Sequence, residues 1–87
     1  MNNLDLTIII LSYNTKDITC RCLDKLKIAK EYCEKRLKNR VQVIVLDNAS
    51  SDGSVGLIKS GYPWVKLIVS KENLGFSKGN NLAMKQV

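Results

Sequence analysis

Three short apolar runs, separated by stretches with helical spacing, constrain the fold of this chain more than any other feature. They are residues 6–11 (LTIIIL), 41–46 (VQVIVL) and 65–69 (VKLIV). Continuous runs rich in β-branched residues are typical of strands covered on both faces, as the strands of parallel sheets are. Strands that alternate with helices wind such a sheet through right-handed crossovers. The pattern therefore predicts an α/β fold.

The first connecting stretch, residues 16–37, has the spacing of an amphipathic helix. Apolar residues recur there at intervals of three and four, and they predict the face that packs on the sheet. These residues are Ile18, Cys22, Leu26, Ala29 and Cys33. We expect Asn14 or Thr15 to cap the start of this helix and Asn39 to end it.

The second connecting stretch predicts a short helix over residues 55–59, closed by Gly61. Three small polar residues precede it and are candidates to cap its first turn. These are Ser50, Ser51 and Asp52. A last helix is expected over residues 76–86, after Gly75.

The resulting order is β-α-β-α-β-α, without a repeat, a linker or a low-complexity tract. We therefore expect a Rossmann-like fold with a three-stranded parallel sheet. A chain of 87 residues has room for one small domain, so the whole of residues 1–87 is assigned to it.

Positive charge is concentrated in the first connecting stretch. Residues 16–40 hold nine of the fourteen Lys and Arg residues and four acids, so five of the six net positive charges lie there. Such a patch can attract nucleic acid, an anionic membrane surface or a phosphorylated ligand, or it can simply be a solvated helix face. Nucleic acid is the least favoured of these, because the chain has only five aromatic residues and no recognised nucleic-acid motif.

The cysteines and the apolar runs bear on the cellular compartment. Three cysteines in the pattern C-x-C-x10-C, with no histidine, match no zinc motif, and we expect free thiols packed as small hydrophobic groups. No apolar run reaches the roughly 18 residues that span a bilayer. From these features we expect a cytoplasmic protein.

Polar residues follow the predicted strands at the edge where ligands bind in open α/β sheets. Asp47 can accept hydrogen bonds from a ribose or a base edge, or only from backbone N–H groups of the turn. Asn48 adds an amide that both donates and accepts, which suits a pyrimidine edge. Tyr13 can stack on a base or pack on the end of the sheet.

The glycine-rich phosphate loops of other nucleotide-binding families are absent from the chain. Neither G-x-G-x-x-G nor G-x-x-x-x-G-K-[ST] occurs, which argues against nicotinamide and ATP sites of the usual kinds. Lys71 and Lys78 lie near the same predicted edge, where they can meet a diphosphate or remain solvated.

Three segments in register carry a resemblance to a known family. "IIILSYNTKDITCRCLDKL", "VQVIVLDNASSDGSVGLIK" and "VKLIVSKENLGFSKGNNLAMK" resemble, in order and spacing, the opening of family-2 glycosyltransferases with the GT-A fold. The resemblance runs from about Leu6 to Lys85 and is close to the branch with rhamnosyltransferase-like enzymes of bacterial cell-surface polysaccharides. It implies that the chain is the first half of a GT-A nucleotide-binding domain, apparently truncated.

The resemblance also implies which residues bind the nucleotide. The loop with Tyr13 and Asn14 would border the nucleoside, and Asp47 and Asn48 match the acidic pair that holds the base and the ribose. Asn48 replaces a more usual Asp, and its amide oxygen can still accept from the N3–H of uracil or thymine.

A second segment is carried over in the same way. The residues after the third predicted strand resemble the family loop that closes over the base and ribose, and Gly75, Gly79 and Asn80 belong to it, with Lys78 beside them. Gly79 stands where many members carry Arg, which weakens the case for a phosphate-binding cation at that position.

The implied reaction is an inverting transfer of a hexose from a nucleoside diphosphate, of UDP or dTDP type, in cell-surface polysaccharide synthesis. The family's metal, Mg²⁺ or Mn²⁺, is held by an Asp-x-Asp motif, and a further carboxylate acts as general base. The chain contains no Asp-x-Asp, so no catalytic or metal-binding residue is assigned and the 87 residues alone are expected to be inactive. The alternative is a stand-alone nucleotide-binding or scaffolding half-domain without catalysis.

Two partners besides the nucleotide sugar are expected. By the resemblance the strand order is 3-2-1, which leaves residues 6–11 as an apolar edge strand, and such edges favour self-association. The basic helix is compatible with peripheral contact at the inner face of a membrane.

Overall fold

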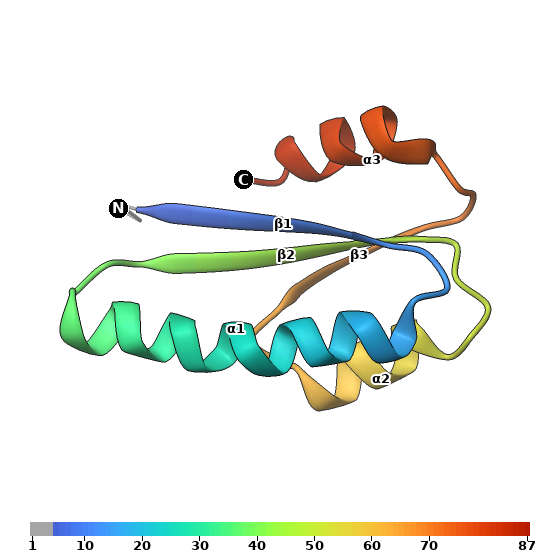
Figure 1. Ribbon diagram of the computed structural model, residues 1–87. Coiled ribbons are helices and arrows are strands. Elements are labelled where there is room, and N and C mark those ends of the chain that lie inside the picture. The colour runs from blue at the N-terminus through green and yellow to red at the C-terminus, as the bar shows by residue number, and fades with distance from the viewer. Residues whose placement is uncertain (1–4) are drawn as a thin grey trace.

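The computed structural model describes residues 5–87 and has the alternating order that the sequence predicts (Figure 1). Each of the first two strands is followed by a helix that returns the chain to the start of the next strand, and the third strand is followed by the last helix. The elements are β1 (Leu6–Ser12), α1 (Lys16–Arg36), β2 (Val41–Asn48), α2 (Ser54–Gly61), β3 (Lys66–Ser70) and α3 (Gly75–Met84).

The three strands form one parallel sheet in the order β1-β2-β3, with β2 in the centre. Ser12 of β1 pairs with Asp47 of β2, and Asn48 of β2 pairs with Ser70 of β3. The carboxyl ends of all three strands therefore lie side by side. This register brings together the polar segments that the sequence places after each strand.

Helices cover both faces of the sheet, with α1 and α2 on one side and α3 on the other (Figure 1). Successive residues of a strand point to opposite faces. Val43 and Val45 accordingly pack with Leu23 of α1, and Ile44 and Leu46 pack with Ala83 of α3. Burial on both faces explains why residues 43–46 of β2 are all apolar.

The buried face of α1 differs from the predicted face. Thr19 and Leu23 are the buried residues of the helix, whereas Ile18 is 69% exposed and Cys22 and Ala29 are also exposed. The prediction counted only hydrophobic residues and therefore missed Thr19. The hydroxyl of Thr19 can be buried because it is hydrogen-bonded to that of Ser12, 3.0 Å away. Leu26 and Cys33, the other two predicted residues, do pack against the core.

The start of α1 agrees with the prediction in position, and its end does not. Thr15 is the N-cap residue, but its side chain makes no capping hydrogen bond. The backbone N–H of Lys16 instead donates to Asp52 Oδ2, 3.0 Å away in the β2–α2 loop. The helix ends at Arg36, before the predicted Asn39. Lys38 takes the left-handed turn there, with a φ of 60°.

The three cysteines are free thiols, as predicted. Cys22 is exposed, although the sequence predicts that it packs in the core. Among residues 5–87, no helix has the length and apolar character needed to cross a membrane.

Candidate functional site

Asp47 is fully buried at the carboxyl end of the central strand. Its Oδ2 accepts a hydrogen bond of 2.8 Å from the backbone N–H of Ser50. Within residues 5–87, its Oδ1 is buried and has no hydrogen-bond partner. Buried acceptors are nearly always paired, and leaving one unpaired costs about 1–3 kcal/mol. One oxygen therefore serves the turn, and the other remains available to a donor that enters the site.

Asn48, the next residue, is 4% exposed and holds the loop between β3 and α3. Its Oδ1 accepts from the backbone N–H of Leu74 at 3.3 Å, and its Nδ2 donates to the carbonyl oxygen of Gly75 at 3.5 Å. Both distances are longer than the usual 2.9–3.0 Å for N–H···O bonds. The Asn48 amide thus joins β2 to the segment that leads into α3. Because both hydrogen bonds are long, a ligand that bonds to the amide at a shorter distance can replace them.

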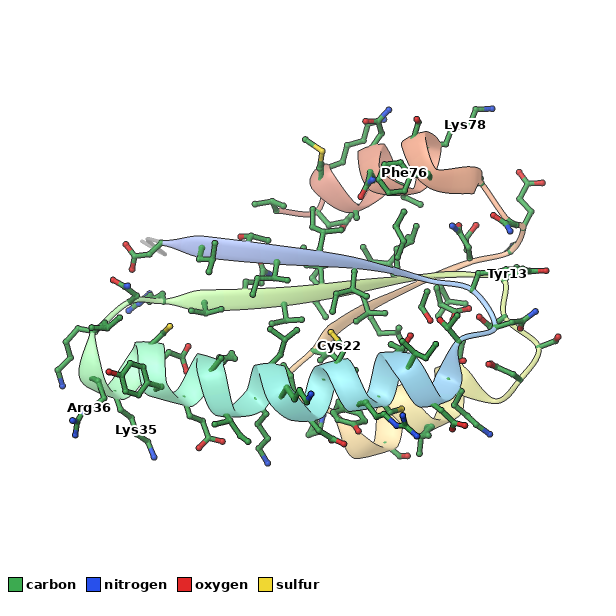
Figure 2. All side chains as sticks on the ribbon, viewed as in Figure 1. Tyr13, Cys22, Lys35, Arg36, Phe76 and Lys78 are labelled. Atoms are coloured by element: carbon green, nitrogen blue, oxygen red, sulfur yellow. The ribbon has the colours of Figure 1, made fainter. Side chains whose placement is uncertain are left out.

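Asn14 joins the β1–α1 loop to the β2–α2 loop. Its backbone is left-handed, with a φ of 50°, which Asn tolerates better than most residues. Its backbone N–H donates to Ser50 Oγ at 2.9 Å, and its Oδ1 accepts from the N–H of Ser51 at 2.8 Å. Tyr13, directly before it, is 48% exposed at the same edge of the sheet (Figure 2).

Asp52 makes a second connection between the same two loops. Besides the N–H of Lys16 at Oδ2, it binds the N–H of Ser54 at 3.1 Å and the Ser54 hydroxyl through Oδ1. One carboxylate therefore holds the first turns of both α1 and α2. The Ser54 hydroxyl, helped by these N–H groups and against the effect of burial, lowers the pKa of Asp52 below its ordinary value.

We call the group formed by Asn14, Lys16, Ser50, Ser51, Asp52 and Ser54 the loop clasp. The sequence indicates part of it, because an acidic residue before Ser54 is a recognisable helix cap. It does not indicate the bond to Lys16, which lies 36 positions away in the chain. Only the register of β1 against β2 brings those two residues together.

The predicted site residues of α3 take different positions. Gly79 is buried against the sheet, where an added Cβ would lie 3.0 Å from Leu46 Cδ2 and 3.2 Å from Leu11 Cδ2. Gly75 begins the helix with a φ of 76°. Asn80 is half-buried, and Lys78 is exposed and points away from the sheet (Figure 2).

A hollow of about 410 Å³ lies beside the loop clasp, on the side of α1. Of the predicted site residues it includes only Asn14. The Asp52 carboxylate in its wall already has both oxygens bonded within the protein. The hollow is therefore a weaker candidate for a specific ligand than the edge at Asp47, where an acceptor is unpaired.

The residues at this edge do not fit a divalent metal. Among residues 5–87, no group of three or more His, Cys, Asp or Glu side chains gathers. Mg²⁺ and related hard cations need about six oxygen ligands, of which a protein site supplies several. No step of a reaction is therefore assigned to a metal on these residues.

Comparison with known proteins extends this description. Residues 7–87 match the family model described as glycosyl transferase family 2. No curated protein sequence matches the chain.

A similar solved structure is the mannosyltransferase PcManGT from Pyrobaculum calidifontis, in complex with GDP-Man and Mn²⁺. It is 22% identical with a TM-score of 0.69, and the match covers 100% of this chain and 25% of that chain. The present chain thus spans a quarter of that protein's length. At this identity the likeness shows the fold, and the chain has the Rossmann-like architecture of the N-terminal half of a GT-A domain.

Proposed function

Because the chain belongs to glycosyl transferase family 2, we propose that it forms the donor-binding part of a nucleotide-sugar glycosyltransferase. The observation that carries the proposal is the unpaired, buried Oδ1 of Asp47 at the carboxyl end of the central strand. A nucleotide that donates an N–H or O–H to this oxygen would satisfy it. Such a donor gains more from this oxygen than from an acceptor already paired with water.

We propose that the base is a pyrimidine, as in UDP or dTDP sugars. Uracil and thymine carry one N3–H donor between two carbonyl acceptors, which Asp47 and the donating side of Asn48 complement. GDP-Man, which the mannosyltransferase binds, has a purine base instead. From the sequence resemblance we further propose that the enzyme belongs to the rhamnosyltransferase-like branch and transfers the sugar with inversion. We also propose that it acts in the synthesis of cell-surface polysaccharides.

The test is a series of amide NMR spectra of the labelled chain with UDP, dTDP, GDP and ADP. We expect UDP and dTDP to shift Asn14, Asp47, Asn48 and Gly75, and the purine nucleotides to leave them in place. Shifts with GDP alone would keep donor binding and overturn the pyrimidine assignment. A dispersed spectrum that ignores all four nucleotides would contradict donor binding by this chain.

The Asp47→Asn variant tests the residue itself. Asn can still accept from the N–H of Ser50, but it can present a donor in place of the unpaired Oδ1. We expect binding of UDP to weaken about tenfold or more, because two donors then face each other. Lys59→Gln, on the exposed side of α2, is the matched control and should bind as the parent chain does.

We propose that these 87 residues alone do not transfer sugar, because holding a donor does not stabilise a transition state. Release of UDP from a UDP-hexose in the presence of the pure chain would overturn this. A second candidate, a nucleotide-binding or scaffolding half-domain, is favoured by the missing metal ligands among residues 5–87. The sequence encoded beyond Val87 distinguishes the two, because only a transferase needs the metal motif.

We also propose that the chain associates with itself through β1, in the cytoplasm. β1 lies at the edge of the sheet, and its outer backbone groups can pair with a strand of another copy. Light scattering at high protein concentration should detect dimers or larger species. A monodisperse monomer would contradict this. Peripheral contact with the inner face of a membrane is a further proposed property.

A further inference from the structure

We infer that the outward face of α1 docks on an anionic lipid surface. This inference specifies the residues of the proposed membrane contact, and it does not depend on nucleotide binding. The face consists of apolar and basic residues that the fold leaves exposed, although half of them read as core residues in the sequence. We call it the α1 outer stripe. Its residues are Ile18, Cys22, Lys25, Ala29, Tyr32 and Arg36.

The stripe follows alternating steps of four and three along the helix, so its six residues share one line of α1. All six are exposed, Ile18 at 69% and Tyr32 at 56%. Ile28, at 73% the most exposed large apolar side chain of the helix, lies outside the stripe, between Asp24 and Glu31 in the neighbouring row. From position 18 to 36 the line is about 27 Å long, at 1.5 Å per residue.

The acids of α1 lie outside the stripe. Asp17, Asp24 and Glu31 occupy the neighbouring row, where they alternate with Arg21, Ile28 and Lys35. This row lies toward α2, because Asp24 Oδ1 accepts a hydrogen bond of 2.7 Å from the Tyr62 hydroxyl. The fourth acid, Glu34, is paired with Lys30 at 3.0 Å.

The stripe itself contains no carboxylate. It carries two cations, Lys25 and Arg36. The Arg36 guanidinium lies 6.0 Å from the centre of the Tyr32 ring, and Figure 2 shows Arg36 pointing away from the sheet. Two cations and an interfacial aromatic residue are thus gathered with the exposed Ile18 along one line of the helix.

This composition favours lipid over another helix. A helix packed along the stripe would bury Lys25 and Arg36, and buried charges without partners are costly. A second copy would bring the same positive charges and repel. On an anionic membrane the cations stay among the head groups, while Ile18 enters the boundary of the acyl chains. Tyr side chains favour that same depth.

The experiment is sedimentation of the full chain with vesicles of phosphatidylcholine, with and without about one quarter phosphatidylglycerol. We expect binding only to the phosphatidylglycerol vesicles, and weaker binding at high salt. The double variant Lys25→Gln/Arg36→Gln should lower the partition coefficient about 25-fold, since each basic residue near such a surface contributes roughly fivefold. Ile18→Ser should lower it several-fold without any change in charge.

The matched control is Lys59→Gln/Lys85→Gln, which removes the same charge from exposed positions outside α1. Near-parental binding by this control, together with the loss in the stripe variants, supports the inference. Equal losses in the two double variants would mean that net charge alone attracts the chain, and would overturn it. Absence of binding to phosphatidylglycerol vesicles, or binding only to an acidic peptide, would also overturn it.

All variants change exposed side chains, so amide NMR spectra should show the parental fold. Nucleotide titrations of the same samples keep the two proposals apart. Binding to vesicles without binding to nucleotide would support the membrane contact and contradict the donor site. Binding to nucleotide without binding to vesicles would support the donor site and contradict the membrane contact.

Discussion

At the scale of single residues, Asp52 and Asp47 have different roles in the candidate site. Asp52 has both oxygens bonded to groups of the protein and holds two helices in place. Asp47 has one oxygen bonded to the turn and the other unpaired. Asp47 lies near the end of β2 and Asp52 in the loop that follows, and the sequence predicts Asp47 as a ligand contact and Asp52 as a helix cap. Because one oxygen of Asp47 is unpaired, Asp47 is the better candidate for a ligand contact.

Acid should weaken the loop clasp through Asp52. Its pKa is lowered in the folded chain, so the carboxylate stabilises the fold above the unfolded pKa of about 3.9. This stabilisation is lost as the pH falls from about 4 through the lower folded pKa. We expect the urea midpoint of the parent chain to drop over this range more steeply than that of Asp52→Asn. Equal slopes would show that the Asp52 carboxylate does not stabilise the clasp. Glu34, whose pKa the Lys30 hydrogen bond also lowers, contributes equally to both proteins.

At the scale of elements, the strands were easier to predict than the helix faces. Each strand of the sheet contains a run of three or more consecutive apolar residues, and such runs need no choice of face. In α1 the choice between neighbouring rows depended on whether Thr19 or Ile18 points inward. The hydroxyl contacts of Thr19 with Ser12 and Thr15 make its burial acceptable, and they depend on a strand end that the helix sequence does not contain.

Two substitutions in α1 test which row is buried. Leu23 is fully buried, so Leu23→Ala should lower the free energy of unfolding by about 2–5 kcal/mol. Ile18→Ala removes an exposed side chain and should change it by less than about 0.5 kcal/mol. Chemical denaturation of the two variants and the parent chain measures both. Similar losses at the two positions would mean that Ile18 is covered in solution.

At the scale of the whole molecule, the layer arrangement and strand order follow from the alternation of elements. The connections between loops do not, because Lys16 and Asp52 or Asn48 and Leu74 are far apart in sequence. The resemblance to the family supplied the candidate site residues, and the hydrogen bonds show which of them hold loops together. The distance of α3 from the sheet is set by the contact of Gly79 with Leu46 and Leu11, and the spacing of residues in the sequence does not predict this contact.

Two glycines test this close approach of α3. Gly56 in α2 has no atom within 4 Å of an added Cβ, so Gly56→Ala should stabilise the chain by about 0.5–1 kcal/mol through helix propensity. At Gly79 the same gain is opposed by crowding with Leu46 and Leu11, and Gly79→Val should destabilise by about 1–3 kcal/mol. Thermal unfolding compares them. A stabilising Gly79→Val would mean that α3 stands further from the sheet.

The loop clasp also has a consequence for hydrogen exchange. The amides of Asn14, Lys16 and Ser51 are each held by a side chain from the opposite loop, and not by a helix or a strand partner. They can exchange with solvent only when the two loops separate, so their exchange rates should share one opening free energy. That energy lies below the energy of opening the sheet, because no strand pairing has to break. The floor of the site is thus an independently opening unit, and a bound nucleotide would slow these three amides together.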